Sequence, residues 1–267
     1  LIKRPFERTK VILDLEFNNV PKSNAKRLKL KNEIIEIGAV KVDNEYNVLD
    51  RFRLMVKPEY NDVVDKKIFK LTSIQNKDVR EACVLCSALE QFEYWLGTEP
   101  IKVYTWSGSD LLQIKKECDR KEISTLLLDE SHTKWVDIQR IFDILTDSSQ
   151  KTSLKNAIYF CGIDLKGQEH DAFYDAIHTA EIAKYIKSGE VSRIKRQNDS
   201  LICREPLKSW GGIPLEQRRK LEELLKVMSD KQESGFDCCE DSENSYNVGR
   251  ESKIVIKDDI HDNNMTC

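Results

Sequence analysis

Asp14 and Glu16 lie close together in an apolar stretch of the chain, residues 10–17 (KVILDLEF). In an extended strand alternate side chains point to the same face, so the two carboxylates would lie side by side. Val11, Leu13 and Leu15 would then face the other way. Like charges at that spacing repel, and a divalent cation between them would remove the repulsion. The alternative is a strand that ends in solvent, with both acids at its exposed end.

A third acid, Asp110, follows the short apolar stretch 101–106 and a Ser-Gly-Ser turn. The pattern places it at the start of a helix that follows a buried strand. It could therefore be an ordinary acid in the first turn, stabilised by the helix dipole. It could also extend to the same end of the sheet as the first pair of carboxylates.

His170 and Asp175 lie at the entry of an amphipathic segment, residues 171–187. Asp175 falls on or near the buried face of this predicted helix, where an unpaired carboxylate would be costly. His170 precedes the helix, in a segment that we expect Gly167 and Gln168 to leave free to move. A histidine there can accept a proton from water. The alternative is a surface histidine in a loop.

The elements that position these residues are predicted from periodicity and turn residues. Three strands over residues 10–17, 33–43 and 48–57 form a meander. The further elements expected are short strands at 101–106 and 135–138 and helices at 82–96, 111–121, 140–145, 153–160 and 171–187. Strands first, followed by alternating strands and helices, predict an α/β fold with a mixed sheet flanked by helices. This domain is expected to span residues 8–190.

The polar stretch 18–32 is predicted to be a loop that leaves the first strand just beyond its carboxylates. It contains five basic residues: Lys22, Lys26, Arg27, Lys29 and Lys31. A solvated loop and a loop that grips phosphates are both compatible with this composition.

The charge of the chain is unevenly distributed. The 267 residues carry a net charge of −3, and residues 230–267 alone carry −6, which leaves a slightly basic body at +3. A basic body favours a polyanionic partner. No signal peptide and no run of about 18 apolar residues occurs, so we expect a soluble, cytoplasmic protein that does not enter a membrane.

The eight cysteines do not have the spacing of a disulfide framework or of a zinc site. The single Cys-x-x-Cys pair, Cys83 and Cys86, is predicted to pack in the core on a helix face. Residues 191–229 are predicted to be a helical extension, with a helix at 214–229 that could dimerise or bind a protein partner. Residues 230–267 are predicted to be an acidic, disordered tail.

Three motifs in this order resemble those of a known family. Asp14-Leu15-Glu16, then Asp110 after YTWSGS, and then HDAFYD over residues 170–175 are similar to the exonuclease motifs of the DEDDh group. This group belongs to the DnaQ-like (RNase H-like) superfamily of 3′-to-5′ exonucleases. The strings EIIEIGAV, LTSI and DIQ support the resemblance, which covers roughly residues 8–190. The tyrosine-using sister group would need Tyr at position 171, which is Asp.

The resemblance implies the chemistry of the site. Asp14, Glu16, Asp110 and Asp175 would be catalytic and would hold two ions of Mg²⁺ or Mn²⁺, the hard ions that carboxylates select. His170 would be catalytic as the base that takes a proton from the attacking water. The product would be a nucleoside 5′-monophosphate released from the 3′ end of single-stranded nucleic acid.

The resemblance also places Leu15, Phe17 and Asn18 at the substrate. Phe17 and Asn18 depart from the Thr and small residue of many relatives, which bears on the preference for base or sugar. Phe17 could stack on a base, but a lone aromatic residue at a strand end favours core packing.

The expected activity is therefore that of a 3′-to-5′ exonuclease, with RNA preferred over DNA as its substrate. One alternative is a DNA proofreading or repair exonuclease. Another, from a different class, is a catalytically silent nucleic-acid-binding scaffold on the same fold.

Overall fold

The computed structural model describes residues 9–202 and contains one mixed β-sheet. The spatial order of its strands is β4-β3-β2-β1-β5-β6. β1, β2 and β3 are antiparallel neighbours, whereas β5, β6 and β4 join in parallel pairings. The strand bounds are β1 Thr9–Asn19, β2 Asn32–Val42, β3 Val48–Lys57, β4 Cys83–Val84, β5 Ile101–Thr105 and β6 Thr133–Asp137. The predicted meander and mixed sheet are confirmed.

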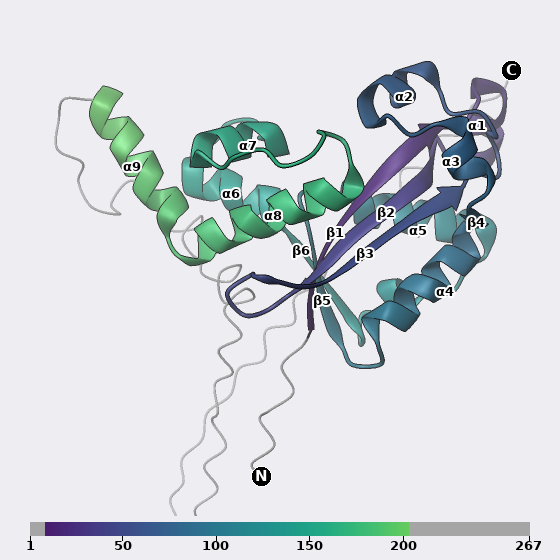
Figure 1. The fold of residues 1–267 in the computed structure, drawn as a ribbon, viewed down its shortest axis with the longest axis horizontal. Helices are drawn as coiled ribbons and strands as arrows, with labels where there is room; N and C mark the ends of the chain where they lie inside the picture. Colours follow the sequence, from purple (N-terminus) through teal and green to yellow (C-terminus); the bar gives the residue numbers. More distant parts are fainter. Residues whose placement is uncertain (1–8, 203–267) are drawn as a thin grey trace, which may run out of the picture. The chain divides into compact units, whose positions relative to one another are not determined.

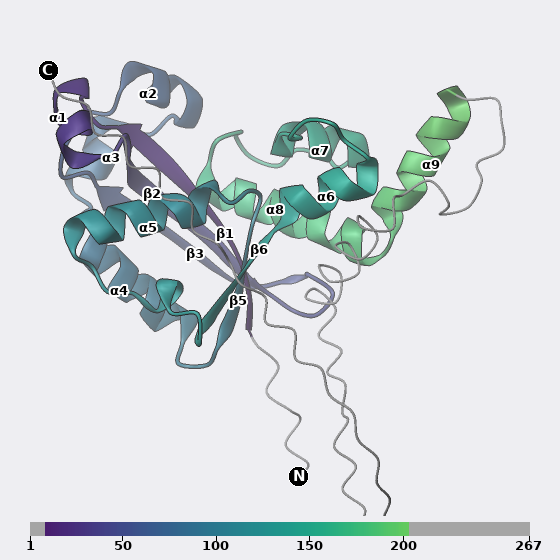
Figure 2. The ribbon, with the colours of Figure 1, turned by 180° about the vertical axis from the view of Figure 1, so that it is seen from behind.

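Helices cover both faces of this sheet. α6, α7 and α8 lie on one side and α4 and α5 on the other (Figures 1 and 2). The helix bounds are α1 Lys22–Leu28, α2 Lys66–Thr72, α3 Asn76–Arg80, α4 Leu85–Leu96, α5 Ser109–Lys121, α6 Ile138–Thr146, α7 Leu154–Cys161, α8 Ala172–Lys187 and α9 Glu190–Ile202, with a 3₁₀ turn at Leu126–Leu128. Within the described range no helix combines the length and apolar character needed to cross a membrane.

The central strand β1 divides its side chains between two cores, as its period of two predicts. Ile12 packs in the core beneath α6, α7 and α8. Val11, Leu13 and Leu15 pack in the opposite core, against α4 and α5. Asp14 and Glu16 alternate with these residues and so lie on the α8 side of the sheet.

Gly38 allows α8 to approach the sheet closely. It is the cross-strand partner of Asp14 on β2. A Cβ atom built at Gly38 would lie 2.2 Å from the backbone carbon of Ala172, in the first turn of α8. The start of α8 therefore rests directly on the strand beside Asp14, an approach that only glycine permits.

A bulge interrupts β2 opposite the last catalytic candidate of β1. Glu16 pairs with Glu36, but the next residue, Phe17, pairs with Ile34. The extra residue, Ile35, is fully buried in a small separate core with residues of the segment that contains α2 and α3. The bulge thus anchors this segment next to the end of β1.

Several local predictions need correction. The stretch 18–32 is not a continuous loop, because β1 continues to Asn19 and α1 follows Pro21. The helix expected from residue 82 begins at Leu85, since Cys83–Val84 pairs with β3 at the sheet edge. Cys86 is exposed and does not pack in the core, while Cys83 is partly buried against it. α2 and α3 were not predicted.

α9 begins at Glu190, the last residue of the expected domain. Gly189 has φ +76° and separates α8 from α9. Val191, in the first turn of α9, is fully buried in the core of α6, α7 and α8. The helix expected at 214–229 and the acidic segment 230–267 lie outside the described residues.

Candidate active site

The catalytic candidates come from three separate parts of the chain and converge at one end of β1. Asp14 and Glu16 lie on β1, Asp110 in the first turn of α5, and Asp175 in the first turn of α8. β5, which precedes α5, runs parallel to β1 as its direct neighbour. Since parallel strands end on the same edge, the start of α5 lies beside the end of β1.

The pKa of Asp14 shows how closely these groups approach one another. Burial raises this pKa well above its ordinary value, and the charges of Asp110, Asp175 and Glu16 raise it further. Each of these carboxylates therefore lies near enough to Asp14 to oppose its ionisation. The four acids predicted from the sequence form one electrostatic cluster.

Glu16 and Asp110 are perturbed in the same direction. Burial raises the pKa of Glu16 to about 8, and Asp175 adds to the shift. Burial also raises the pKa of Asp110 to about 7, although hydrogen bonds from its own backbone N–H, the Ser109 hydroxyl and the Leu15 backbone N–H oppose the rise. Both carboxyl groups thus hold a proton unusually strongly unless a positive charge is supplied.

His170 lies at the open side of this cluster. Candidate ligand atoms of Glu16, His170 and Asp175 all lie within 4.8 Å of one another. The His170 side chain is exposed, and its backbone has φ +58°, in the left-handed region that histidine seldom adopts. The imidazole is therefore accessible to solvent beside two carboxylates.

The donor set fits a hard divalent cation. Four carboxylates offer only oxygen ligands, the kind that Mg²⁺ and Mn²⁺ prefer. Within residues 9–202 no lysine or arginine forms a salt bridge to any of the four. The repulsion that, after burial, raises the pKa values of Asp14 and Glu16 is therefore left for a bound ion to remove.

A second group of residues orients α8, and the sequence reasoning missed its members Arg53 and Glu36. Arg53 on β3 donates from Nε to the Glu36 Oε1 atom at 2.6 Å and from Nη2 to the Asp171 Oδ2 atom at 2.8 Å. Asp171 caps α8 by accepting the backbone N–H groups of Phe173 and Tyr174. Glu36, fully buried, is the cross-strand partner of Glu16. An acid inside the apolar string EIIEIGAV was the available signal.

The segment that carries His170 is fastened rather than free, which corrects the expectation for Gly167 and Gln168. Gln168 donates from Nε2 to the Ser73 hydroxyl at 2.9 Å and to the Leu71 carbonyl at 3.2 Å. Gly167 has φ +71°, and a Cβ atom there would lie 2.3 Å from the ring of Tyr174. The loop is thus tied to the end of α2 on one side and packed on α8 on the other.

The three substrate-binding candidates differ in exposure. Leu15 is buried in the core, and Phe17 is partly buried against the same core, as its core alternative predicted. Asn18 is fully buried: its Nδ2 donates to the Val63 carbonyl at 3.0 Å and its Oδ1 accepts the Asp65 N–H at 2.9 Å. The Asn18 amide therefore holds the loop before α2. Substrate binding by Asn18 stays a prediction.

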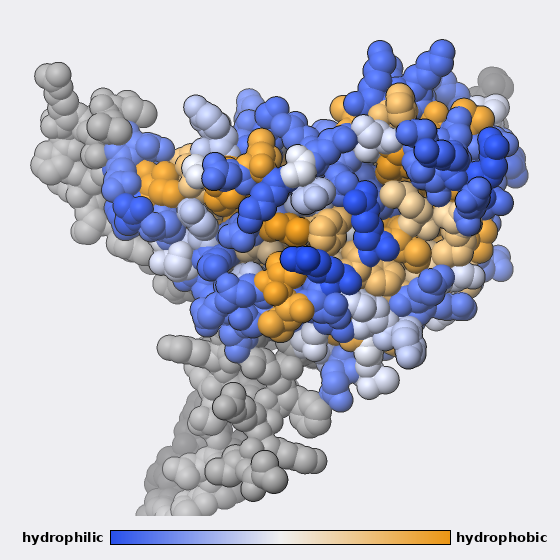
Figure 3. Space-filling model, viewed as in Figure 1, coloured by the Kyte–Doolittle hydropathy of each residue, from blue (hydrophilic) through white to orange (hydrophobic). Residues whose placement is uncertain are grey.

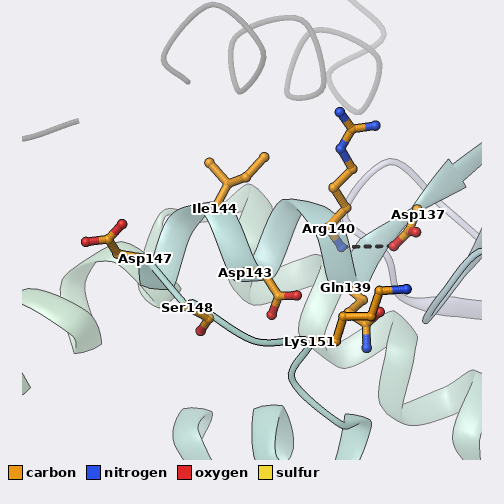
Figure 4. Close-up of a pocket in the computed structure, with 8 residues that line it drawn as sticks. All are labelled: Asp137, Gln139, Arg140, Asp143, Ile144, Asp147, Ser148 and Lys151. Atoms are coloured by element: carbon orange, nitrogen blue, oxygen red, sulfur yellow. Dashed lines mark hydrogen bonds between the residues drawn. The ribbon is translucent and has the colours of Figure 1, made fainter. Parts of the chain in front are cut away.

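A hollow of about 360 Å³ along α6 is separate from the carboxylate cluster. Figure 4 shows its lining residues, with the Arg140 backbone N–H donating to the Asp137 carboxylate at 2.9 Å. One lining residue, Asp137, acts on the cluster electrostatically: the charge of Asp137 contributes to the raised pKa of Asp110. None of the five catalytic candidates lines this hollow.

Two curated proteins that resemble this chain are named as exoribonucleases. Human ERI1 exoribonuclease 2 is 29% identical over 188 residues, which is 61% of this chain and 27% of the relative. The zebrafish (Danio rerio) protein of the same name is 28% identical over 174 residues, covering 57% of this chain and 31% of the relative. The chain thus spans less than a third of the length of these curated relatives.

Solved structures share the fold. The nuclease domain of 3′hExo, a DEDDh family member bound to rAMP, superposes with a TM-score of 0.59 at 21% identity, covering 70% of this chain and 95% of that one. Cell-death related nuclease 4 (CRN-4) superposes with a TM-score of 0.58 at 21% identity, covering 68% of this chain and 64% of that one. The RNase_T exonuclease family model matches residues 11–183, from β1 to α8. The chain belongs to this exonuclease family.

Proposed function

We propose that this protein is a metal-dependent 3′-to-5′ exonuclease that removes nucleoside 5′-monophosphates from single-stranded nucleic acid, with RNA preferred. One observation carries the proposal. Four buried or partly buried carboxylates from β1, α5 and α8 gather at the end of β1, where burial and the charges of their neighbours raise the pKa values of Asp14 and Glu16, and no lysine or arginine of the described chain forms a salt bridge to any of the four. The exoribonuclease names of the curated relatives support RNA as the substrate.

In this proposal Asp14, Glu16, Asp110 and Asp175 hold two ions of Mg²⁺ or Mn²⁺. When bound, such ions polarise the scissile phosphate and stabilise the charge on the departing 3′ oxygen. The protein contributes fixed positions: β1 is central in the sheet, and α5 and α8 begin against it. Asp171, which caps α8, and Arg53 keep the last carboxylate in place.

His170 is proposed to act as the general base. Its exposed ring lies beside Glu16 and Asp175, where water can reach both the imidazole and the carboxylates. A ring nitrogen can take the proton of an attacking water molecule and pass it to solvent. The ties of Gln168 to the end of α2 hold this base near its position before substrate arrives.

A basic groove beyond the end of β1 supports a polyanionic substrate. The groove has a volume of about 800 Å³ and lies between α1 and the start of α2. Its lining includes four exposed lysines: Lys22, Lys26, Lys31 and Lys67. Within the described chain none of these lysines forms a salt bridge. Figure 3 shows hydrophilic residues over α1 and α2, with hydrophobic residues among them. This favours the phosphate-gripping alternative for the stretch 18–32.

The decisive experiment is incubation of the purified protein with 5′-labelled single-stranded RNA and DNA in Mg²⁺, Mn²⁺ or EDTA. We expect stepwise shortening from the 3′ end, abolished by EDTA and by Asp14→Asn, and faster on RNA. Faster shortening of DNA would favour the repair alternative. If the protein binds the RNA and the DNA but cleaves neither in Mg²⁺ or Mn²⁺, the scaffold alternative is favoured over the enzyme.

Three broader features are also part of the proposal. The catalytic domain spans residues 8–190, and residues 191–229 form an extension through which a protein partner or a second copy binds. The protein acts in the cytoplasm, which the free state of Cys83, Cys86, Cys118 and Cys161 supports. Expression of a tagged full chain, followed by fractionation and size-exclusion chromatography, tests location and oligomeric state.

A further inference from the structure

We propose that His178 is a positioning residue that orients the Asp175 carboxylate and couples it to the loop carrying His170. The inference rests on the proposed function, since Asp175 is one of the carboxylates proposed to hold metal. His178 lies three residues after Asp175 on α8, so both side chains lie on the same side of the helix. Its side chain is almost completely buried, at 2% exposure.

The hydrogen bond at one ring nitrogen fixes the position of the ring proton. The backbone N–H of Lys166 donates to His178 Nε2 at 3.0 Å. Nε2 must present a lone pair to accept this bond, so in the neutral ring the proton is on Nδ1. His178 therefore offers one N–H donor, at Nδ1.

That donor faces Asp175. Nδ1 is buried and has no hydrogen-bond partner among the described residues, and the Asp175 Oδ1 atom lies 3.8 Å from it. A buried N–H without a partner is costly. A shift of roughly 1 Å would bring the two atoms to hydrogen-bond distance. Donation to Oδ1 would hold the carboxylate plane and leave Oδ2 available to a cation.

The ring also connects this carboxylate to the neighbouring loop. Lys166 lies in the segment between α7 and α8, which continues through Gly167 and Gln168 to His170. One imidazole thus bonds the backbone of the base-bearing loop and faces a proposed metal ligand. An ordinary core histidine would account for the first contact. The inference therefore rests on the second, the unpaired Nδ1 that lies 3.8 Å from the Asp175 Oδ1 atom.

Two substitutions separate the contacts. In His178→Gln the amide oxygen can replace Nε2 as the acceptor for Lys166, but no donor faces Asp175. In His178→Asn the amide nitrogen can replace Nδ1 as the donor, but the Lys166 N–H loses its acceptor. His132→Gln is the matched control, because its buried Nε2 also lacks a partner but it lies outside the carboxylate cluster.

The measurement is Mn²⁺ binding to the full chain without nucleic acid, by electron paramagnetic resonance. We expect His178→Gln to weaken Mn²⁺ binding about tenfold, as loss of a residue that orients a metal ligand does, and the other two variants to change it less than about threefold. Wild-type affinity in His178→Gln, or equal losses in the Gln and Asn variants, would overturn the inference.

Two further readouts separate positioning from a general structural role. In the cleavage assay His178→Gln should lower kcat at limiting Mn²⁺, recover as Mn²⁺ is raised, and leave the KM for RNA unchanged. ¹⁵N shifts of the wild-type ring need no variant: a proton on Nδ1 supports the inference and a proton on Nε2 refutes it.

If wild-type protein binds Mn²⁺ and cleaves RNA while His178→Gln matches it, only the His178 inference fails. If wild-type protein does neither, the proposed function fails with it.

Discussion

Two groups of acids in this molecule differ in whether a positively charged side chain of the protein neutralises them. At the end of α5, Lys121 places its ammonium group 2.8 Å from Glu117 and Glu59 and 3.3 Å from Glu33. The Lys121 side chain is only 5% exposed. In the cluster of Asp14, Glu16, Asp110 and Asp175, which is proposed to be catalytic, no lysine or arginine of the described chain forms a salt bridge.

Two of the carboxylates around Lys121 also accept hydrogen bonds from backbone N–H groups. Glu33 accepts the N–H groups of residues 59, 60 and 61, and Glu117 accepts that of Ile34. These acids hold the loop after β3 onto β2 and α5. The protein thus neutralises one group of acids with its own lysine and leaves the other group without such a partner. This contrast favours an external cation as the partner of the second group. Four experiments test this contrast, from the largest expected effect to the smallest.

Removing the internal cation should have the largest effect on stability. Lys121→Met leaves Glu33 and Glu117 buried without a positive partner, which costs about 3–5 kcal/mol of unfolding free energy. Urea unfolding measures the loss. Lys116→Met, on the exposed part of the same helix, is the control and should stay within about 0.5 kcal/mol of wild type. A small loss in Lys121→Met would show that this group does not depend on its lysine.

The unneutralised group predicts an unusual pH dependence without metal. Glu16 goes from an ordinary pKa of 4.5 to about 8 in the folded protein, and Asp110 from 3.8 to about 7. Between the ordinary and the raised pKa values the folded protein binds more protons than the unfolded chain, so the free energy of unfolding falls as pH rises from about 4 to about 8. We expect a loss of a few kcal/mol in urea unfolding with EDTA, and its recovery when saturating Mn²⁺ is added at pH 8. A flat profile would contradict the raised pKa values.

Removing one carboxylate from the proposed catalytic group should stabilise the metal-free protein. Asp14→Asn relieves repulsion with three carboxylates, so we expect a gain of about 1–2 kcal/mol at pH 8 in EDTA, opposite in sign to Lys121→Met. The same variant should lose cleavage and lose its stabilisation by Mn²⁺. Asp119→Asn, an exposed acid on α5, serves as the comparison and should change neither property. Destabilisation of Asp14→Asn in EDTA would mean that the cluster is not repulsive.

Arg53 tests an intermediate case, because it pairs with Glu36 and Asp171 next to the proposed site but not with the four carboxylates proposed to hold metal. Its side chain is 43% exposed, so Arg53→Gln should cost only about 1 kcal/mol of stability. By loosening the start of α8 it should lower kcat about tenfold with little change in KM. Arg51→Gln, exposed on the same strand, is the reference variant. An unchanged kcat would show that the contacts of Arg53 with Glu36 and Asp171 do not determine the position of Asp175.

Local pattern predicted much of this arrangement. The period of two in β1 placed Asp14 and Glu16 on one face, and the helical spacing after residue 171 placed Asp175 near the sheet. The contacts of Glu36 with Arg53 and of His178 with Lys166 join segments that only the folded sheet and helices bring together. The same is true of α2 and α3, which are short helices held by the bulge residue Ile35 rather than by a strong periodic pattern.

Gly38 also links assembly of the site to correct pairing of the first hairpin. Only at this position of β2 does the strand lack a side chain, and it lies opposite Asp14 under the first turn of α8. If β2 slipped by one residue, the side chain of Ile37 or Ala39 would lie there and keep α8 away. A misregistered hairpin therefore cannot bring Asp175 to Asp14. The four carboxylates therefore come together only when β1 and β2 are paired in the correct register. Gly38 makes formation of the site depend on that register.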